Sequence, residues 1–165
     1  MAYNNQNWSN NRPGQGNYGN RGGNYPPRAE VKPVAAEPLP KDFVDRAEAV
    51  LIALKKKKDE NNKVSIITTS KIRNLLSMIT DIYNVEILRG DSVLTAESVQ
   101  SVTMARIRMI YEAGREPAVK EFLEKAKLLE YIKDIGDDRQ KLIDFTHYME
   151  ALVAYHRFYI GGKEG

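Results

Sequence analysis

Apolar residues recur at helical spacing along most of the chain, and the pattern is densest between residues 95 and 113. At about 100° per residue, the apolar arc of a helix over Thr95–Ala113 covers more than half of its circumference. We therefore expect neighbouring elements to cover this helix on most sides. Gly114 is predicted to end it, and Pro117 to begin the next helix. The arc contains Val99, Val102, Met104, Ile107, Met109, Ile110, Tyr111 and Ala113.

One charged residue, Arg106, lies in the middle of this apolar arc. A guanidinium is tolerated there when its stem packs along the core and its charge meets a carboxylate or backbone carbonyls. The pattern favours this interpretation. The alternative is that the face around Arg106 meets a partner, and the helix alone does not decide between the two.

The same periodicity predicts four further helices, so we expect an all-α fold, a compact bundle of about five helices with short connections. Side chains able to cap a helix stand at three of the predicted starts: Asp42, the run 68–70, and Asp137 or Asp138. The further helices are expected from Pro40 to the lysines at 55–58, from residues 68–70 to Leu88, from Pro117 to Lys133, and from Asp137 or Asp138 toward the C-terminus.

Residues 1–40 differ in composition from the rest of the chain. They hold six of the seven prolines and five of the eleven glycines, among asparagines, scattered arginines and aromatic residues. Such a segment buries too little apolar surface to offset its ordering entropy. We expect a disordered tail over 1–40 and a helical domain over 41–165. The tail is either a solubilising arm or a loose RNA-holding segment.

Composition narrows the function classes. The chain has no cysteine, which removes disulfides, thiolate metal sites and a cysteine nucleophile. No apolar run reaches the length of a membrane span, so we expect a cytoplasmic protein without a membrane partner. We find no catalytic motif and no metal-ligand spacing. We therefore expect no enzyme activity, no cofactor and no metal site.

Two surfaces have patterns that each allow two interpretations. Arg73, Ser77, Thr80 and Asn84 share one side of the second predicted helix, which suits either phosphate and ribose contacts or a plain solvent face. The end of the last helix is rich in tyrosine, which suits either a core edge or a protein interface. The formal net charge is only +3, so RNA binding by the helical domain would depend on where its charges are placed.

Three stretches together resemble the small subunit of type III-A CRISPR effector complexes, the second subunit of the Csm system. They are TTSKIRNLLSMITDIYN at 68–84, RMIYEAGREPAVKEFLEKAKL at 108–128 and YMEALVAYHRFYIGGKEG at 148–165. Their order and spacing match the family across most of residues 41–165. At the YIGGK stretch the chain departs from the family pattern by an extra Ile160 before the glycines.

The resemblance implies a non-catalytic, all-helical protein for antiviral defence. Its copies would stack in a minor filament beside the backbone and large subunits, along the guide (CRISPR) RNA and the target RNA. It also implies residues for contact with the RNA backbone. These are Lys71, Arg73 and Asn74 in the first stretch, Arg115 and Lys120 in the second, Arg106 and Arg108 at the edge of the second, and Arg157 in the last. Arg115 is either such a contact or a structural clamp on exposed carbonyls, and Glu150 shares the side of Arg157 and is an alternative partner for its charge.

A different class of function competes with this one. The helical domain would then be a scaffold or adaptor that binds only proteins, through its tyrosine-rich last helix and the lysines at 55–58. Any RNA association would come from the tail. Deleting the tail distinguishes the two hypotheses.

Overall fold

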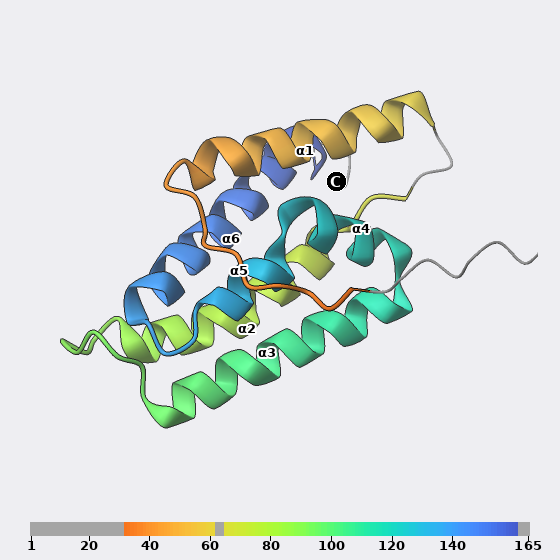
Figure 1. The fold of residues 1–165 in the computed structure, drawn as a ribbon. Coiled ribbons are helices and arrows are strands. Elements are labelled where there is room, and N and C mark those ends of the chain that lie inside the picture. Colours follow the sequence, from red (N-terminus) through yellow and green to blue (C-terminus); the bar gives the residue numbers. More distant parts are fainter. Residues whose placement is uncertain (1–31, 62–64, 162–165) are drawn as a thin grey trace, which may run out of the picture. The chain divides into compact units, whose positions relative to one another are not determined.

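In the computed structural model, which describes residues 32–61 and 65–161, the chain is all-α, as predicted (Figure 1). Within these ranges there are six helices, and the only strand-like pairing is a single bridge between Val93 and Asp138. The tail predicted to be disordered covers residues 1–40, and its residues 1–31 lie outside the described residues. The helices are α1 (Phe43–Glu60), α2 (Thr69–Glu86), α3 (Ala96–Arg115), α4 (Pro117–Ala126), α5 (Leu128–Asp134) and α6 (Arg139–Tyr159).

Helix α6 packs against α1 on one side and α2 on the other, and α3 packs against α2, α4 and α5 (Figure 1). Two contacts set the antiparallel register of α2 and α6. Nε2 of His156 lies 2.8 Å from the carbonyl oxygen of Ile67, just before α2 begins. Near the other end, the rings of Tyr83 and His147 meet edge to face at 5.9 Å. The start of α2 therefore lies beside the end of α6.

Three helices begin with side-chain caps, and the sequence predicted two of them, those of α2 and α6. The side-chain oxygens of Thr68, Thr95 and Asp138 each accept a hydrogen bond from a backbone N–H in the first turn. Asp42 does occupy the cap position of α1, but its carboxylate accepts no capping hydrogen bond among the described residues. Gly114 does not end α3, which continues to Arg115 before Pro117 opens α4.

The helix predicted over Pro117–Lys133 is two helices, α4 and α5, which is why the structure has six rather than five. Lys127 adopts a left-handed conformation (φ 51°) between them. The reason is a change of apolar face: Leu128 lies two positions after Ala126, about 200° around an ideal helix, yet both are fully buried. A break at Lys127 turns both segments toward the core. The ammonium of Lys127 donates hydrogen bonds of 2.7 and 2.8 Å to the two carboxylate oxygens of Glu37.

Residues 33–40 contain no helix, but they lie against α5. The backbone N–H of Glu37 donates to the carbonyl oxygen of Glu130 at 3.3 Å, and the ammonium of Lys133 donates to the carbonyl oxygen of Val34 at 2.7 Å. Leu39 packs on the core. These contacts belong to the compact unit that begins at Pro33.

Candidate nucleic-acid interface

The eight residues predicted to contact RNA fall into two groups and two separate positions. The first group surrounds the groove between α2 and α3, and the second lies where α2 and α6 run side by side. Arg106 and Lys120 belong to neither. The first group is Lys71, Asn74, Arg108 and Arg115, and the second is Arg73 and Arg157.

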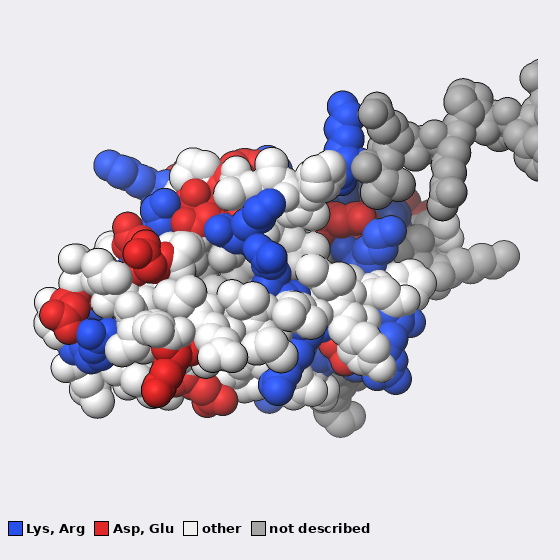
Figure 2. Space-filling model, turned by 60° about the horizontal axis from the view of Figure 1, so that its bottom comes forward, with Lys and Arg blue, Asp and Glu red and all other residues white. Residues whose placement is uncertain are grey.

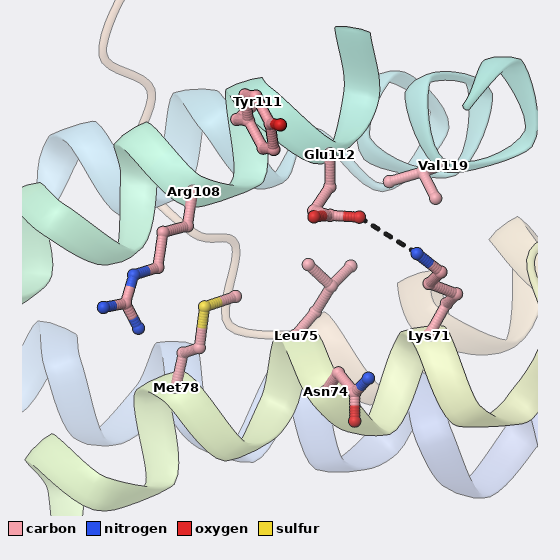
Figure 3. Close-up of a pocket in the computed structure, with 8 residues that line it drawn as sticks. All are labelled: Lys71, Asn74, Leu75, Met78, Arg108, Tyr111, Glu112 and Val119. Atoms are coloured by element: carbon pink, nitrogen blue, oxygen red, sulfur yellow. Dashed lines mark hydrogen bonds and ion pairs between the residues drawn. The ribbon is translucent and has the colours of Figure 1, made fainter. Parts of the chain in front are cut away.

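The α2–α3 groove contains a cavity of about 270 Å³, called here the α2–α3 pocket (Figure 3). Three of the predicted residues line it: Lys71 and Asn74 from α2 and Arg108 from α3. Figure 3 shows the Arg108 side chain reaching from α3 toward α2 beside Met78. The remaining lining residues are Leu75, Met78, Tyr111, Glu112 and Val119.

Lys71 is held by two carboxylates within the protein. Its ammonium lies 3.0 Å from Oε2 of Glu112 and 2.8 Å from Oε1 of Glu116. The hydrogen bonds to Glu116 and Glu112 raise the pKa of Lys71 above its ordinary value. A charge that is already neutralised attracts phosphate weakly, so phosphate binding by Lys71 requires the ammonium to leave at least one of these partners.

Arg115 is placed beside the same pocket by two contacts. Its guanidinium lies 3.8 Å from Oε1 of Glu112 and 5.5 Å from the centre of the Tyr111 ring. The guanidinium remains mostly exposed, and such surface pairs contribute little to stability. Arg115 therefore stays accessible to an anionic partner while it orients Tyr111.

Arg73 and Arg157 form the second group, called here the α2–α6 edge. Each lies ten residues from the Tyr83–His147 contact, in opposite directions along antiparallel helices. At 1.5 Å per residue, both stand about 15 Å from that contact, at the same level of the helix pair. Both are exposed, and neither forms an ion pair with any described carboxylate, Glu150 included. Within the described residues, no carboxylate neutralises their charges.

In the polar stripe beside Arg73, Ser77 is exposed and Thr80 is half-buried, and both hydroxyls already donate within the helix. Ser77 donates to the carbonyl oxygen of Asn74 at 3.0 Å, and Thr80 donates to that of Leu76 at 3.1 Å. A hydroxyl oxygen keeps acceptor capacity after donating, which suits a ribose hydroxyl better than a phosphate. Asn84 is exposed on the same side of α2.

The remaining two predicted residues point elsewhere. Arg106 is half-buried on the edge of α3 that turns away from Arg108, and its guanidinium forms no ion pair or hydrogen bond in the part of the chain that the structure describes. The interpretation of Arg106 as a paired core arginine is therefore not supported. Lys120 is exposed on α4, and its ammonium nitrogen lies 3.8 Å from Oε1 of Glu124.

One prediction about α3 is wrong: its outer face is not covered. Met104, Ile107, Ile110 and Tyr111 are 45%, 49%, 51% and 62% exposed, and they are called here the α3 outer face. The helices that pack most closely on α3, namely α2, α4 and α5, meet its opposite side through Val102, Ala105 and Met109. Figure 2 turns the α3 side toward the viewer and shows a broad uncharged area along its middle. Exposed apolar surface of this kind marks interaction sites.

The tyrosine-rich end of α6 is mostly a core edge. Tyr148 is fully buried and donates to the carbonyl oxygen of Ala126 at 2.9 Å. Tyr155 stacks on Tyr159, whose hydroxyl donates to Oε1 of Glu48. Phe158, 77% exposed, is the aromatic residue of this helix end that faces solvent most fully.

Glu86 is a buried carboxylate that the sequence pattern did not reveal. Glu86, at the end of α2, has no exposed surface; it accepts hydrogen bonds from Arg89 at 2.8 Å and from the backbone and hydroxyl of Thr95 at 3.2 and 3.1 Å. Burial alone would raise its pKa, but hydrogen bonds from Ser98, Thr95 and Arg89 outweigh burial and lower the pKa to about 2. Glu86 thus ties the end of α2 to the start of α3.

The described residues contain no cluster of three or more histidine, aspartate or glutamate side chains that could hold a metal ion. A search of the same residues finds no helix long and apolar enough to span a membrane. What the surface does offer is exposed arginines along α2 and α6, a small mixed pocket, and an apolar helix face. An all-α protein with these features belongs to the class of binding or assembly proteins.

The match to a family model identifies the family within that class. Residues 39–162 match the model described as Csm2 type III-A. The chain therefore belongs to the Csm2 family, the small-subunit family of the type III-A CRISPR complex that the sequence resemblance indicated.

Curated relatives agree. A protein of Streptococcus thermophilus named CRISPR system Cms protein Csm2 is 42% identical over 123 residues, which cover 74% of this chain and 94% of the relative. Proteins of the same name from Mycobacterium tuberculosis (strain CDC 1551 / Oshkosh) and Enterococcus italicus are 38% and 34% identical. Those matches cover 71% and 64% of this chain, and 90% and 80% of the relatives.

Proposed function

We propose that the chain is a cytoplasmic, non-catalytic small subunit that contacts the backbone of guide and target RNA in a type III-A effector complex. Its copies stack in a minor filament and meet the other Csm subunits, including the backbone and large subunits. Membership of the Csm2 family supports the place in the complex. Base identity is left to pairing between guide and target, as in other RNA-guided systems.

The observation that carries RNA contact is the α2–α6 edge. Arg73 and Arg157 stand at one level of the helix pair, exposed and without a carboxylate partner among the described residues. Exposed guanidinium groups bind phosphate oxygens with paired N–H donors, and such contacts carry no sequence information. Arg108 offers a third such guanidinium across the α2–α3 groove.

The other predicted residues have smaller roles in this proposal. Asn74 and Arg115 lie beside Arg108 and supply a neutral amide and a second cation. Lys71 contributes only after a carboxylate partner is displaced. Arg106 and Lys120 lie apart and would touch RNA only where the strand runs beyond these two groups.

Replacing Arg73 with alanine tests the proposal. We expect RNA association to weaken to the same extent on unrelated sequences, and its salt dependence to fall by about one phosphate contact. Binding measured by fluorescence anisotropy over a range of salt concentrations gives both quantities. Lys125→Ala, which removes an exposed cation from α4, is the matched control. A loss confined to one RNA sequence, or an equal loss with Lys125→Ala, would contradict the proposal.

A second candidate function is a protein-only scaffold, with no RNA contact by the helical domain. The α3 outer face favours it, because methionine and tyrosine are enriched in protein interfaces. The surfaces that the sequence suggested for this role are less available. Lys57 pairs with Glu121 at 2.6 Å, and the tyrosines of α6 are largely packed. Protein binding by the α3 outer face is compatible with RNA contact at the α2–α6 edge, so this face does not by itself exclude the first function.

A further inference from the structure

The α2–α3 pocket combines three kinds of surface within about 270 Å³. Leu75, Met78 and Val119 supply apolar side chains, and the Tyr111 ring supplies an aromatic one (Figure 3). Asn74 supplies an amide that both donates and accepts hydrogen bonds. The charged lining residues are Arg108, Lys71 and Glu112.

The charges in the pocket disfavour a phosphate. The Glu112 carboxylate lines the cavity and would repel an anion, and the Lys71 ammonium that faces it is already bound by Glu112 and Glu116. Arg108 alone remains as an available cation in the lining. A neutral ligand avoids the repulsion and leaves the Lys71 ion pairs intact.

The size of the pocket and the chemistry of its lining suit one planar ring. The volume equals roughly nine water molecules at ~30 Å³ each, below the range of pockets that hold drug-sized ligands. Tyr111 presents an exposed ring for stacking, and Arg108 a planar guanidinium. The Asn74 amide matches the mixed donors and acceptors on the edge of a nucleobase.

We propose that the α2–α3 pocket binds one nucleobase of an unpaired or splayed RNA nucleotide, held by Tyr111, Arg108 and Asn74. This inference rests on the proposed contact with RNA and adds a base contact to the phosphate contacts of Arg73 and Arg157. Stacking accepts every base because each has a π face. The pocket therefore anchors the strand without making the protein dependent on one sequence.

The test uses the full-length chain and a short single-stranded RNA with an end-attached dye and an internal fluorescent adenine analogue. Dye anisotropy reports RNA binding, and emission of the analogue reports the environment of the base. We expect binding to change the emission, and Tyr111→Leu to abolish that change while Tyr111→Phe keeps it. Replacing the analogue by an abasic site should weaken wild-type binding by roughly fivefold or more and leave Tyr111→Leu binding unaffected.

Two control variants separate this inference from the proposed function. Arg73→Ala should weaken binding yet retain the full emission change at saturation, because it removes a phosphate contact only. Phe158→Leu removes another exposed aromatic residue and should change neither signal. Thermal unfolding confirms that each variant is folded.

Each remaining outcome has one meaning. If anisotropy rises while the emission stays constant at every labelled position, RNA binds but the pocket holds no base, and this inference alone is overturned. If anisotropy never rises, the proposed RNA contact fails and the inference fails with it. If Tyr111→Leu leaves the emission change intact, the base is sensed outside this pocket and the inference is overturned.

Discussion

At the scale of single residues, charged side chains in this protein are sorted by whether the fold supplies a partner. Lys71 and Arg73 are two positions apart on α2. Lys71 faces α3 and pairs with Glu112 and Glu116. Arg73 faces solvent, and no described carboxylate forms an ion pair with it. The fold therefore gives the first a structural role and leaves the second exposed, as the proposed RNA contact requires.

Glu86 gives a pH-dependent prediction. Its pKa of about 2 in the folded protein lies below its ordinary value of 4.5, so the ionised carboxylate stabilises the fold above about pH 4.5. That stabilisation, on the order of 3 kcal/mol, is lost as the pH falls from 4.5 toward 2. We expect the free energy of unfolding, measured in urea at each pH, to decline across this window.

Glu86→Gln should destabilise the protein at neutral pH and flatten this decline, because the amide does not titrate and loses the charge-assisted bond from Arg89. Asp81→Asn, on an exposed position of the same helix, is the control and should leave the decline in place. A decline of equal steepness in Glu86→Gln would assign acid sensitivity to other carboxylates.

At the scale of elements, the break between α4 and α5 shows how an apolar face sets helix boundaries. The stripe formed by Val119, Phe122 and Ala126 changes side at Leu128, and the left-handed Lys127 restores a common buried face. This signal is present in the sequence. The change of face at Leu128 indicates a break, but the sequence has no glycine or proline there, and without such a residue the pattern favours one continuous helix.

The left-handed backbone at residue 127 leads to a second prediction. Lys127→Asn and Lys127→Val both remove the ion pair with Glu37, but asparagine tolerates this conformation and a β-branched residue does not. We expect the valine variant to be less stable than the asparagine variant by about 1–2 kcal/mol, measured by chemical denaturation. Equal stability of the two would indicate that the chain relaxes into another conformation at this position.

The two sides of α3 give the third prediction. Met109→Ala should cost about 2–5 kcal/mol in unfolding free energy, because Met109 is fully buried. Ile107→Glu, on the exposed side, should change stability by only about 0.5 kcal/mol while reducing recovery of the chain with other complex subunits. Thermal unfolding and co-purification measure the two effects. Normal recovery of Ile107→Glu with the complex would remove the α3 outer face as a protein contact.

At the scale of the whole molecule, the tail and the helical domain make different contributions to the two candidate functions. Residues 33–40 contact α5 through Glu37 and Val34, so a deletion that preserves the helical domain should end at residue 31. We expect the chain without residues 1–31 to keep its thermal stability and its RNA association. Loss of RNA association with the tail, at unchanged stability, would favour the protein-only scaffold.

The assembly itself can be examined in the native host. Crosslinking a C-terminally tagged chain and purifying it should recover other Csm subunits together with guide RNA, crosslinked through residues 68–84. Recovery of protein partners without RNA would leave the scaffold function. This experiment tests the place of the chain in a complex independently of its affinity as a single copy.

The sequence by itself determined the all-α class, the caps of α2 and α6, most of the buried stripes and the family. The class, the caps and the stripes depend on residues within one or two turns of each other, where the helical period fixes which side chains share a face. The family resemblance depends on the order and spacing of three longer stretches. The tertiary structure alone decided which charges are paired. Lys71 and Glu112 are 41 positions apart, and nothing local to either shows that the other lies within hydrogen-bonding distance.

The same distinction explains why the sequence did not predict the exposed face of α3. Its sequence shows apolar residues around most of the helix, and a buried face and a partner-binding face have the same local pattern. Only the placement of α2, α4 and α5 shows that Met109 is covered and Ile107 is not. Coverage is a property of the neighbours of a helix, so the surface that remains open was visible only once the helices were packed.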